Sequence, residues 1–327
     1  MAKTKKTTYT APIATAIPQN GNRKFAPRAD IVLLVSVTGS NPNGDPDDEG
    51  RPRVDLDGKG VISHVSIKRK FRDTALAYAD SEIGFFDGEE NRNKIFVEHH
   101  TIRSQQVATV LDLNSHPSIK TVLNAKESEN DSDNKKSGCV SREDRAYAAG
   151  KLCETFLDAR VFGQSIGTIG AISGPVQIEN AVSVNVIDIE DRTISATQVA
   201  NTAQQKQKGD HTFGRMSSVH FGLYPIYIHV SGIRAKQTGM TREDFERMLD
   251  ILREMYEQTN SSVRNVQFEQ MFVFEHENLR GSMMSKDLHK LIDFKFKKDV
   301  PSSMDDIEVT VDKDMLDANP GIKFYTK

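Results

Sequence analysis

The chain has 327 residues, two cysteines and a formal net charge of −3 at neutral pH. This length can bury a substantial core, either in one domain with large insertions or in two small domains. Two cysteines are too few for a disulfide scaffold, and no apolar stretch is long enough to span a membrane. We therefore expect a cytoplasmic protein without a membrane partner. The overall charge neither favours nor excludes nucleic acid, so local clusters of positive charge matter more.

Residues 1–29 are rich in Lys, Thr, Ala and Pro and show no hydrophobic periodicity. Such a segment predicts a basic arm or a disordered tail, which could lie on nucleic acid, lie on a neighbouring chain or remain solvated. Residues 31–37, IVLLVSV, then form a short and nearly continuous apolar run. A run of this kind is typical of a central strand.

A helix is predicted for residues 63–79, SHVSIKRKFRDTALAYA. Ser63 is suited to cap its N-terminus, and apolar residues recur behind it at helical spacing. The opposite face is basic, and only Asp73 offsets its positive charge. The cations of this face are Lys68, Arg69 and Arg72, with Lys70 close by.

In the middle of the chain, segments with weak hydrophobic patterning alternate with segments whose patterning is clear. Residues 80–140 are weakly patterned, and residues 141–163 predict one helix capped by Ser141. A glycine-rich run, residues 163–175, follows and predicts tight turns or a close approach of the backbone to a ligand. Residues 176–190 alternate like a half-buried strand. The polar stretch 190–220 is too long for an ordinary hairpin loop, so it predicts a protruding arm.

Residues 221–232 and 267–277 predict two further strands, and residues 240–259 between them predict the clearest helix. Thr241 and Asp244 form a capping box at the start of that helix. Its apolar stripe consists of Phe245, Met248, Leu249, Leu252, Met255 and Tyr256. In chain order the strong elements are strand, helix, strand, strand, helix and strand. This is the ferredoxin-like βαββαβ order, which includes the RNA-recognition fold, so we predict an α+β protein with large insertions.

The segment VSVTGSNPNGDPDDEGRPRVD, residues 35–55, resembles a phosphate loop at first sight. Gly39 and Gly44 give the G-x-x-x-x-G spacing directly after a strand. A nucleotide-binding loop then requires a lysine and a serine or threonine. Asp45 and Pro46 stand there instead, and a carboxylate at that position repels phosphate. The motif therefore argues against ATP binding.

A calcium loop is a second interpretation of the same segment. Asp45, Asp47 and Glu49 occupy alternate positions, as in an EF-hand. Position twelve is Leu56, where a bidentate glutamate is required, and no helix is predicted before the loop. A rigid surface turn, in which Asn and Asp side chains cap the backbone, explains part of this composition.

Two basic segments favour nucleic acid. The helix at 63–79 follows the loop directly, so its N-terminal amides and its cations could converge on phosphates. A solvated helix face is the alternative. In the arm, Arg215 lies between Phe213 and Met216, a combination suited to gripping a backbone or wedging between bases. An ordinary hydrophobic anchor is the alternative there. Residues 220–227 do not match the aromatic RNP1 string, so base stacking on the sheet is not supported.

Several of these segments together resemble a known family. They are GSNPNGDPDDEGRPRVD, ISHVSIKRKFRD, DARVFG, GPVQIENAVSV, TFGRMSSVHFGLY and FEQMFVFEHE. The chain is similar, over about residues 30–290, to the backbone subunit of type I CRISPR Cascade complexes, the Cas-seven family. The subtype that it resembles is I-C or the closely similar I-B.

The resemblance implies a fold and a function. The fold is a modified RNA-recognition palm at 30–290, with a helical insertion at about 80–175 and a thumb at about 190–220. An arm at 1–29 precedes the palm, and a C-terminal extension at 291–327 follows it. The function is non-catalytic: subunits stack head to tail along the guide RNA, and the guide remains available for pairing with target DNA. The implied partners are crRNA, target DNA, copies of the same chain, the crRNA-capping, large and small Cascade subunits, and a separate helicase-nuclease. No cofactor and no metal are expected.

The resemblance also implies which side chains contact RNA. They are Lys68, Arg69, Lys70 and Arg72 in the basic helix, Asn41, Asn43, Arg51 and Arg53 in the signature loop, Gln164 and Ser165 in the glycine-rich run, and Phe213, Gly214, Arg215 and Met216 at the end of the thumb.

Two alternatives remain open. Related type III backbone subunits cleave bound RNA with a loop aspartate and a metal ion, and Asp45, Asp47 or Asp210 could serve in that role here. The chain could also be a generic RNA-binding module outside CRISPR systems.

Overall fold

The computed structural model describes residues 24–81, 84–86, 91–127, 140–196 and 212–327. Most of the predicted arm at 1–29 lies outside these residues. The chain forms two compact units. Unit 1 contains Met1–Arg28, Ala75–Gln177 and Val230–Arg247, and unit 2 contains Ala29–Thr74, Ile178–His229 and Met248–Lys327.

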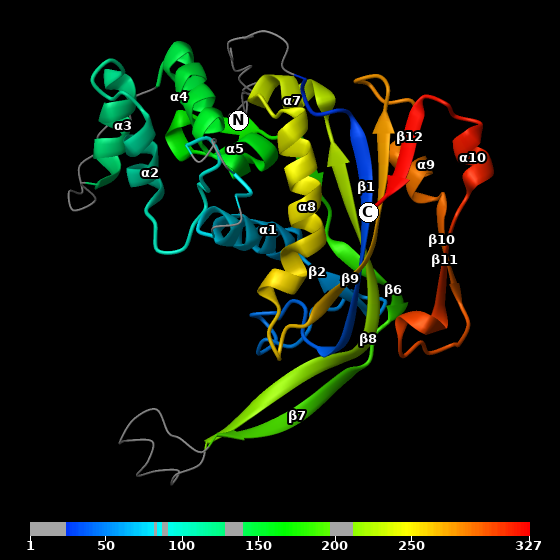
Figure 1. Cartoon of the computed structure of the whole chain (residues 1–327). Coiled ribbons are helices and arrows are strands. Elements are labelled where there is room, and N and C mark those ends of the chain that lie inside the picture. The colour runs from blue at the N-terminus through cyan, green and yellow to red at the C-terminus, as the bar shows by residue number, and fades with distance from the viewer. Residues whose placement is uncertain (1–23, 82–83, 87–90, 128–139, 197–211) are drawn as a thin grey trace, which may run out of the picture. The chain divides into compact units, whose positions relative to one another are not determined.

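The main sheet lies mostly in unit 2 and is built around the first predicted strand (Figure 1). Its order is β12-β9-β1-β8-β5, and β7 pairs with β8 outside this path. The strands are β1 (Ala29–Ser40), β5 (Val176–Ile178), β7 (Ile189–Ala196), β8 (Thr212–Val230), β9 (Val266–His276) and β12 (Ile322–Thr326). The pairs β1–β9, β9–β12 and β7–β8 are antiparallel. The first nine residues of β1 are all buried, so the predicted central strand is confirmed.

Smaller elements complete unit 2. β2 (Lys59–Ile62) pairs with β6 (Ala181–Val186), and β10 (Ile292–Phe296) pairs with β11 (Ile307–Val311). The short helices α9 (Ser285–His289) and α10 (Lys313–Asp317) and the turn η2 (Met304–Asp306) accompany β10 and β11. Leu288, Ile292 and Ile307 of this region pack in one hydrophobic cluster with Val32 and Phe274 of the sheet. Residues after 290 therefore form part of the core and add β12 to the sheet, which the sequence did not predict.

The two strongest helix predictions are confirmed. α1 (His64–Ala79) begins where Ser63 accepts a hydrogen bond from the backbone N–H of Ser66 at 3.3 Å. α8 (Arg242–Thr259) begins with a reciprocal capping box, because Thr241 N–H donates to Asp244 and Asp244 N–H donates to Thr241 Oγ1. The six apolar residues of its predicted stripe are all buried.

Unit 1 is mainly helical. It contains α2 (Arg103–Val110), α3 (Pro117–Glu127), α4 (Arg142–Thr155), α5 (Leu157–Phe162) and α7 (Gly232–Thr238). The glycine-rich run forms a small hairpin, in which β3 (Gly163–Ser165) pairs with β4 (Ala171–Ser173) around the turn η1 (Gly167–Ile169). The Ser141 cap of α4 is confirmed, since its side chain accepts from the N–H of Asp144.

Two elements that the sequence predicted to be continuous, one helix and one strand, are divided in the structure. The single helix expected at 141–163 is broken at Phe156, whose backbone is extended and whose ring packs on Phe96 at 5.1 Å. Leu157 N–H donates to the carbonyl of Lys94, so a pairing between distant segments replaces a helical hydrogen bond. The single strand expected at 176–190 is divided into β5, β6 and the start of β7.

A buried ion pair joins α5 to the start of α8 within unit 1. Arg160 is 1% exposed, and its Nε and Nη2 donate to the two oxygens of Asp244, each at 2.9 Å. The remaining Arg160 donors reach the carbonyls of Arg92 and Cys153 and the side chain of Asn93. Burial alone would raise the pKa of Asp244, but the Arg160 and Arg92 guanidinium groups outweigh burial and lower that pKa to about 2.

Replacing Arg160 removes the main partner of the buried Asp244 carboxylate, which then keeps only the ion pair with Arg92. We expect Arg160→Leu to lower the free energy of unfolding by about 3–5 kcal/mol. Arg242→Leu, which removes the half-exposed pair between Arg242 and Glu246, is expected to cost less than about 1 kcal/mol. Urea denaturation followed by circular dichroism measures both. Equal losses for the two variants would contradict the assigned role of the buried pair.

Candidate nucleic-acid interface

The signature loop, residues 41–58, is anchored where the chain leaves β1. Ser40 Oγ donates to the carbonyl of Asn265 at 2.6 Å, and Asn41 N–H donates to the carbonyl of Val263 at 2.9 Å. The side-chain amide of Asn41 donates to the carbonyl of Gly50 at 2.8 Å. Asn41 therefore ties the loop both to itself and to the segment that precedes β9.

The acidic and amide side chains inside the loop cap the backbone. The Asp45 carboxylate accepts from the N–H of Asp47 at 3.1 Å and lies 3.4 Å from Arg53. Asn43 Oδ1 accepts from the N–H of Ser63 at 2.8 Å, which holds the entry into α1. Asp55 accepts from two further backbone N–H groups, those of residues 57 and 59. The density of Asn and Asp in this segment thus follows from the hydrogen bonds that a compact, sharply folded loop needs.

A groove of about 630 Å³ lies in unit 2 between the signature loop, the strands β7 and β8, and the segment before β9. Four side chains predicted from distant parts of the sequence meet in it: Asn41, Arg51, Arg215 and Met216. Its other lining residues are Asp48, Glu49, Gly50, Asp191, Ser217, Val263 and Arg264.

The arginines of the groove pair with its carboxylates. Arg51 Nη2 lies 3.2 Å from Asp191 Oδ2, and Arg51 Nη1 lies 4.0 Å from Asp48. Arg215 Nη1 lies 3.8 Å from Glu49, and both of these side chains are more than 80% exposed. Exposed pairs of this kind are weak and exchange readily for other anions.

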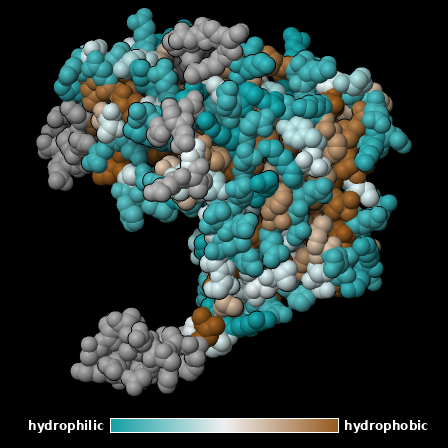
Figure 2. All heavy atoms as spheres, in the orientation of Figure 1, coloured by the Kyte–Doolittle hydropathy of each residue, from teal (hydrophilic) through white to brown (hydrophobic). Residues whose placement is uncertain are grey.

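The predicted protruding arm is a two-stranded ribbon. The pairing of β7 with β8 begins at Ile189, opposite Val219, and ends at Ala196, opposite Thr212. The ribbon extends beyond the other strands of unit 2 (Figure 1). Its surface is mostly hydrophilic (Figure 2), although Ile194 is half-exposed. Residues 197–211, which include Asp210, lie outside the described residues.

The residues assigned to the thumb's end lie within the paired part of β8. Phe213 and Gly214 stand opposite Ser195 and Ile194, and Arg215 and Met216 stand opposite Thr193 and Arg192. Arg215 and Met216 thereby line the groove.

The basic helix is less open than its sequence indicates. Arg72 is 9% exposed, Arg69 pairs with Asp73, and Lys70 Nζ donates to the carbonyl of Thr259 at 3.1 Å. Burial, followed by the charge of Arg72, lowers the pKa of Lys68. Burial, followed by the charge of Arg264, lowers the pKa of Lys70. The charge of Lys70 is therefore felt at Arg264, but Lys70 does not line the groove.

The remaining predicted residues lie elsewhere. Asn43 and Arg53 belong to the signature loop but do not line the groove. Gln164 and Ser165 lie in β3 of unit 1, where the Gln164 amide donates to the Ser165 carbonyl. Arg264 was missed by the sequence analysis. The antiparallel pairing of Val37 with Val266 brings the segment before β9 beside the end of β1, and this register was the missing signal.

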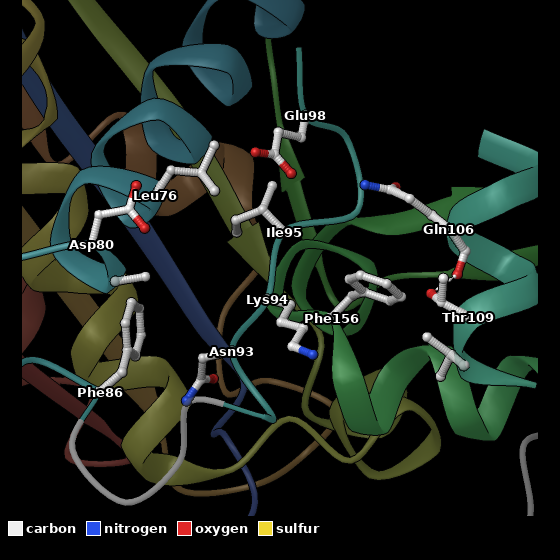
Figure 3. A pocket seen from close by; sticks show the side chains of 12 residues that line it. Leu76, Asp80, Phe86, Asn93, Lys94, Ile95, Glu98, Gln106, Thr109 and Phe156 are labelled. Atoms are coloured by element: carbon white, nitrogen blue, oxygen red, sulfur yellow. Dashed lines mark hydrogen bonds between the residues drawn. The ribbon is translucent and has the colours of Figure 1, made fainter. Parts of the chain in front are cut away.

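A second cavity, of about 410 Å³, lies in unit 1 (Figure 3). Phe86, Ile95 and Phe156 form its buried apolar part, and Asp80 and Glu98 contribute carboxylates. Lys94 is its one cationic lining residue among the described residues. Two carboxylates and one ammonium do not favour a phosphate polymer, so the groove of unit 2 is the better candidate interface.

Neither a clustered metal site nor a membrane-spanning helix is present among the described residues. No group of three or more His, Cys, Asp or Glu residues there is arranged to hold a metal ion. No helix among them combines the length and the apolar character needed to cross a bilayer.

The fold and the groove define a mixed α/β protein with antiparallel strands and an arginine-lined surface groove. The sequence matches the family described as CRISPR-associated protein Cas7 over residues 27–312, and the chain belongs to that family. The resemblance inferred from the sequence is therefore confirmed. A CRISPR-associated protein Cas7 of Haloferax volcanii is 25% identical over 272 residues, which cover 75% of this chain and 69% of that relative.

Solved structures give weaker matches. A chain of a CRISPR RNA-guided surveillance complex in the pre-nicking state has a TM-score of 0.44 and 15% identity, covering 76% of this chain and 78% of that one. A chain of another CRISPR RNA-guided surveillance complex has a TM-score of 0.40 and 14% identity, covering 76% of this chain and 69% of that one.

The tight packing of the signature loop gives a stability prediction. A Cβ added at Gly44 would lie 2.8 Å from the carbonyl oxygen of Gly50, the acceptor of the Asn41 amide. We expect Gly44→Ala to lower the free energy of unfolding by about 1–3 kcal/mol.

Gly150→Ala in α4 is the matched control. A Cβ there meets no atom within 4 Å, so alanine is expected to stabilise the helix by about 0.5–1 kcal/mol. Thermal unfolding of both variants checks that Gly44→Ala lowers stability and that Gly150→Ala raises it. A Gly44→Ala protein as stable as the wild type would show that the loop is not held as described.

Proposed function

We propose that this chain is a non-catalytic guide-RNA-binding backbone subunit of a CRISPR surveillance (Cascade) complex. It polymerises along crRNA and presents the guide for pairing with target DNA. The observation that carries this proposal is the groove, in which Arg51, Arg215 and Arg264 converge in a member of the Cas7 family. A guanidinium group that binds phosphate oxygens in a bidentate manner contacts the backbone and does not read a base. Such contacts suit a protein whose sequence specificity comes from pairing by the guide.

The topology supports an RNA-recognition palm. Within the main sheet the strands β9, β1, β8 and β5 are neighbours, α1 follows β1, and α8 joins β8 to β9 after the short α7. This arrangement agrees with a βαββαβ core. On this proposal α2 to α5 form the helical insertion, and the β7–β8 ribbon forms the thumb.

Assembly with further copies of the chain is the second part of the proposal. An apolar surface in unit 2 supports it, because Leu56 is fully exposed beside the β2–β6 pair, which carries the exposed Val182 and Val186. Exposed apolar surface of this kind marks protein interfaces. The crRNA-capping, large and small subunits, the helicase-nuclease and a cytoplasmic location belong to the same proposal through the family.

Removing a groove arginine should weaken RNA binding regardless of sequence. We expect Arg215→Gln and Arg264→Gln each to reduce affinity for single-stranded RNA roughly tenfold, about the value of one hydrogen bond to a charged group. The slope of log K against log salt should fall by about 0.7 for each lost phosphate contact. Fluorescence anisotropy on two RNAs of unrelated sequence, at several salt concentrations, measures both effects.

Arg234→Gln, at an exposed position on α7 of unit 1, is the control and should change neither affinity nor slope. An unchanged slope for Arg215→Gln and Arg264→Gln would reject the groove as the RNA site. Mass measurements on the same complexes test assembly, because the number of bound chains should grow with RNA length. One chain per RNA at every length would favour a generic binding module.

The absence of catalysis is also a proposal. The Asp45 carboxylate is engaged by the Asp47 N–H and by Arg53, a structural role that explains it without a metal ion. We expect the chain, loaded with guide RNA and given complementary RNA and Mn²⁺, to yield no cleavage product on a denaturing gel. Guided cleavage that Asp45→Ala, Asp47→Ala or Asp210→Ala abolishes would replace this proposal with the type III activity.

A further inference from the structure

The groove carries as many carboxylates as guanidinium groups. The guanidinium groups of its lining belong to Arg51, Arg215 and Arg264, and the carboxylates belong to Asp48, Glu49 and Asp191. A phosphate-binding groove ordinarily has an excess of positive charge. Here the formal charges of the lining cancel, so the carboxylates require an explanation.

Asp191 is fixed in position. Its Oδ1 accepts a hydrogen bond from Ser217 Oγ at 2.5 Å, and Ser217 is its direct partner in the β7–β8 pairing. Its Oδ2 lies 3.2 Å from Arg51 Nη2. Both oxygens are therefore engaged, and the carboxylate occupies the guanidinium face that a phosphate oxygen would use.

Glu49 has an unusual backbone conformation and lies near Arg215. Its φ is +48°, in the left-handed region that residues other than glycine adopt infrequently. A glycine or an asparagine would adopt this conformation at lower cost, so the conformation alone does not explain a glutamate. Its Oε2 lies 3.8 Å from Arg215 Nη1, in an exposed and readily exchanged pair.

We propose that Glu49 and Asp191 compete with phosphate for Arg215 and Arg51. An isolated phosphate must displace a carboxylate that is always present at high local concentration, so it binds poorly. A continuous phosphodiester chain presents several phosphates at once, displaces both carboxylates and remains bound. The groove thus favours long polyanions with regularly spaced phosphates over free nucleotides and inorganic phosphate. This inference rests on the proposed function, because it takes the groove as the RNA site.

Glu49→Gln tests the competition. At low ionic strength we expect it to raise affinity for a mononucleotide and for single-stranded RNA by about twofold to fivefold, the range set by an exposed ion pair. Asp57→Asn removes the same charge from the same loop at a site without an ion pair among the described residues, so it should have no measurable effect. Asp191→Asn should raise affinity in the same direction as Glu49→Gln.

The Arg215→Gln background makes the test specific. If Glu49 competes for Arg215, Glu49→Gln should bring no gain when Arg215 is absent, and anisotropy titrations of the four proteins in this cycle measure the coupling. A gain that persists in the Arg215→Gln background, or a gain equal to that of Asp57→Asn, would overturn the inference. A loss of affinity in Glu49→Gln would overturn it as well. If Arg215→Gln alone does not weaken RNA binding, the proposed function itself fails, which is a distinguishable result.

Discussion

The groove depends on how the chain leaves β1 at Asn41. Two hydrogen bonds from this residue fix three segments together, one to the Val263 carbonyl and one to the Gly50 carbonyl. Arg51 directly follows Gly50, and Arg264 directly follows Val263, so each bond fixes the position of one groove arginine. Each bond contributes only about 1 kcal/mol, but Asn41 itself is 9% exposed, so its N–H groups lose more if left unpaired. The arginines therefore lie close together because backbone geometry brings them there, although their like charges repel one another.

The choice of arginine in the groove has a geometric reason. A guanidinium group offers a planar fork of donors that matches a phosphate group. On α1, by contrast, burial lowers the pKa of Lys68 and Lys70. Arg72 is 9% exposed, so it offers little surface to a ligand. The positive charge that a phosphate chain could reach in the groove is therefore that of the signature loop, the ribbon and the segment before β9.

Local signals in the sequence predicted the fold well where short-range physics decides it. The β1 strand, the caps at Ser63 and Ser141 and the Thr241–Asp244 box all follow from neighbouring residues. The features that the sequence did not predict depend on pairings between distant segments. The break at Phe156 depends on the carbonyl of Lys94, the strand β12 depends on β9, and the place of Arg264 depends on the register of β9 against β1. No local pattern carries that information. Of the residues expected to contact RNA, the groove unites four from two separate segments, whereas Asn43 is engaged by the N–H of Ser63 and Arg53 by Asp45.

The pairing of β1 with β9 also sets an order of folding. Ile31 faces Val273, so the central strand finds this neighbour only after most of the chain has been synthesised. Contacts of such high sequence separation form late and slowly, because a long loop must close before they contribute. Until then β1 is an apolar edge without this partner, and it needs protection from pairing with other chains. The groove that we assign to the guide is completed by the same closure. On the proposed function, a nascent chain therefore cannot hold RNA there before β9 has paired with β1, which separates synthesis of the subunit from its loading with RNA.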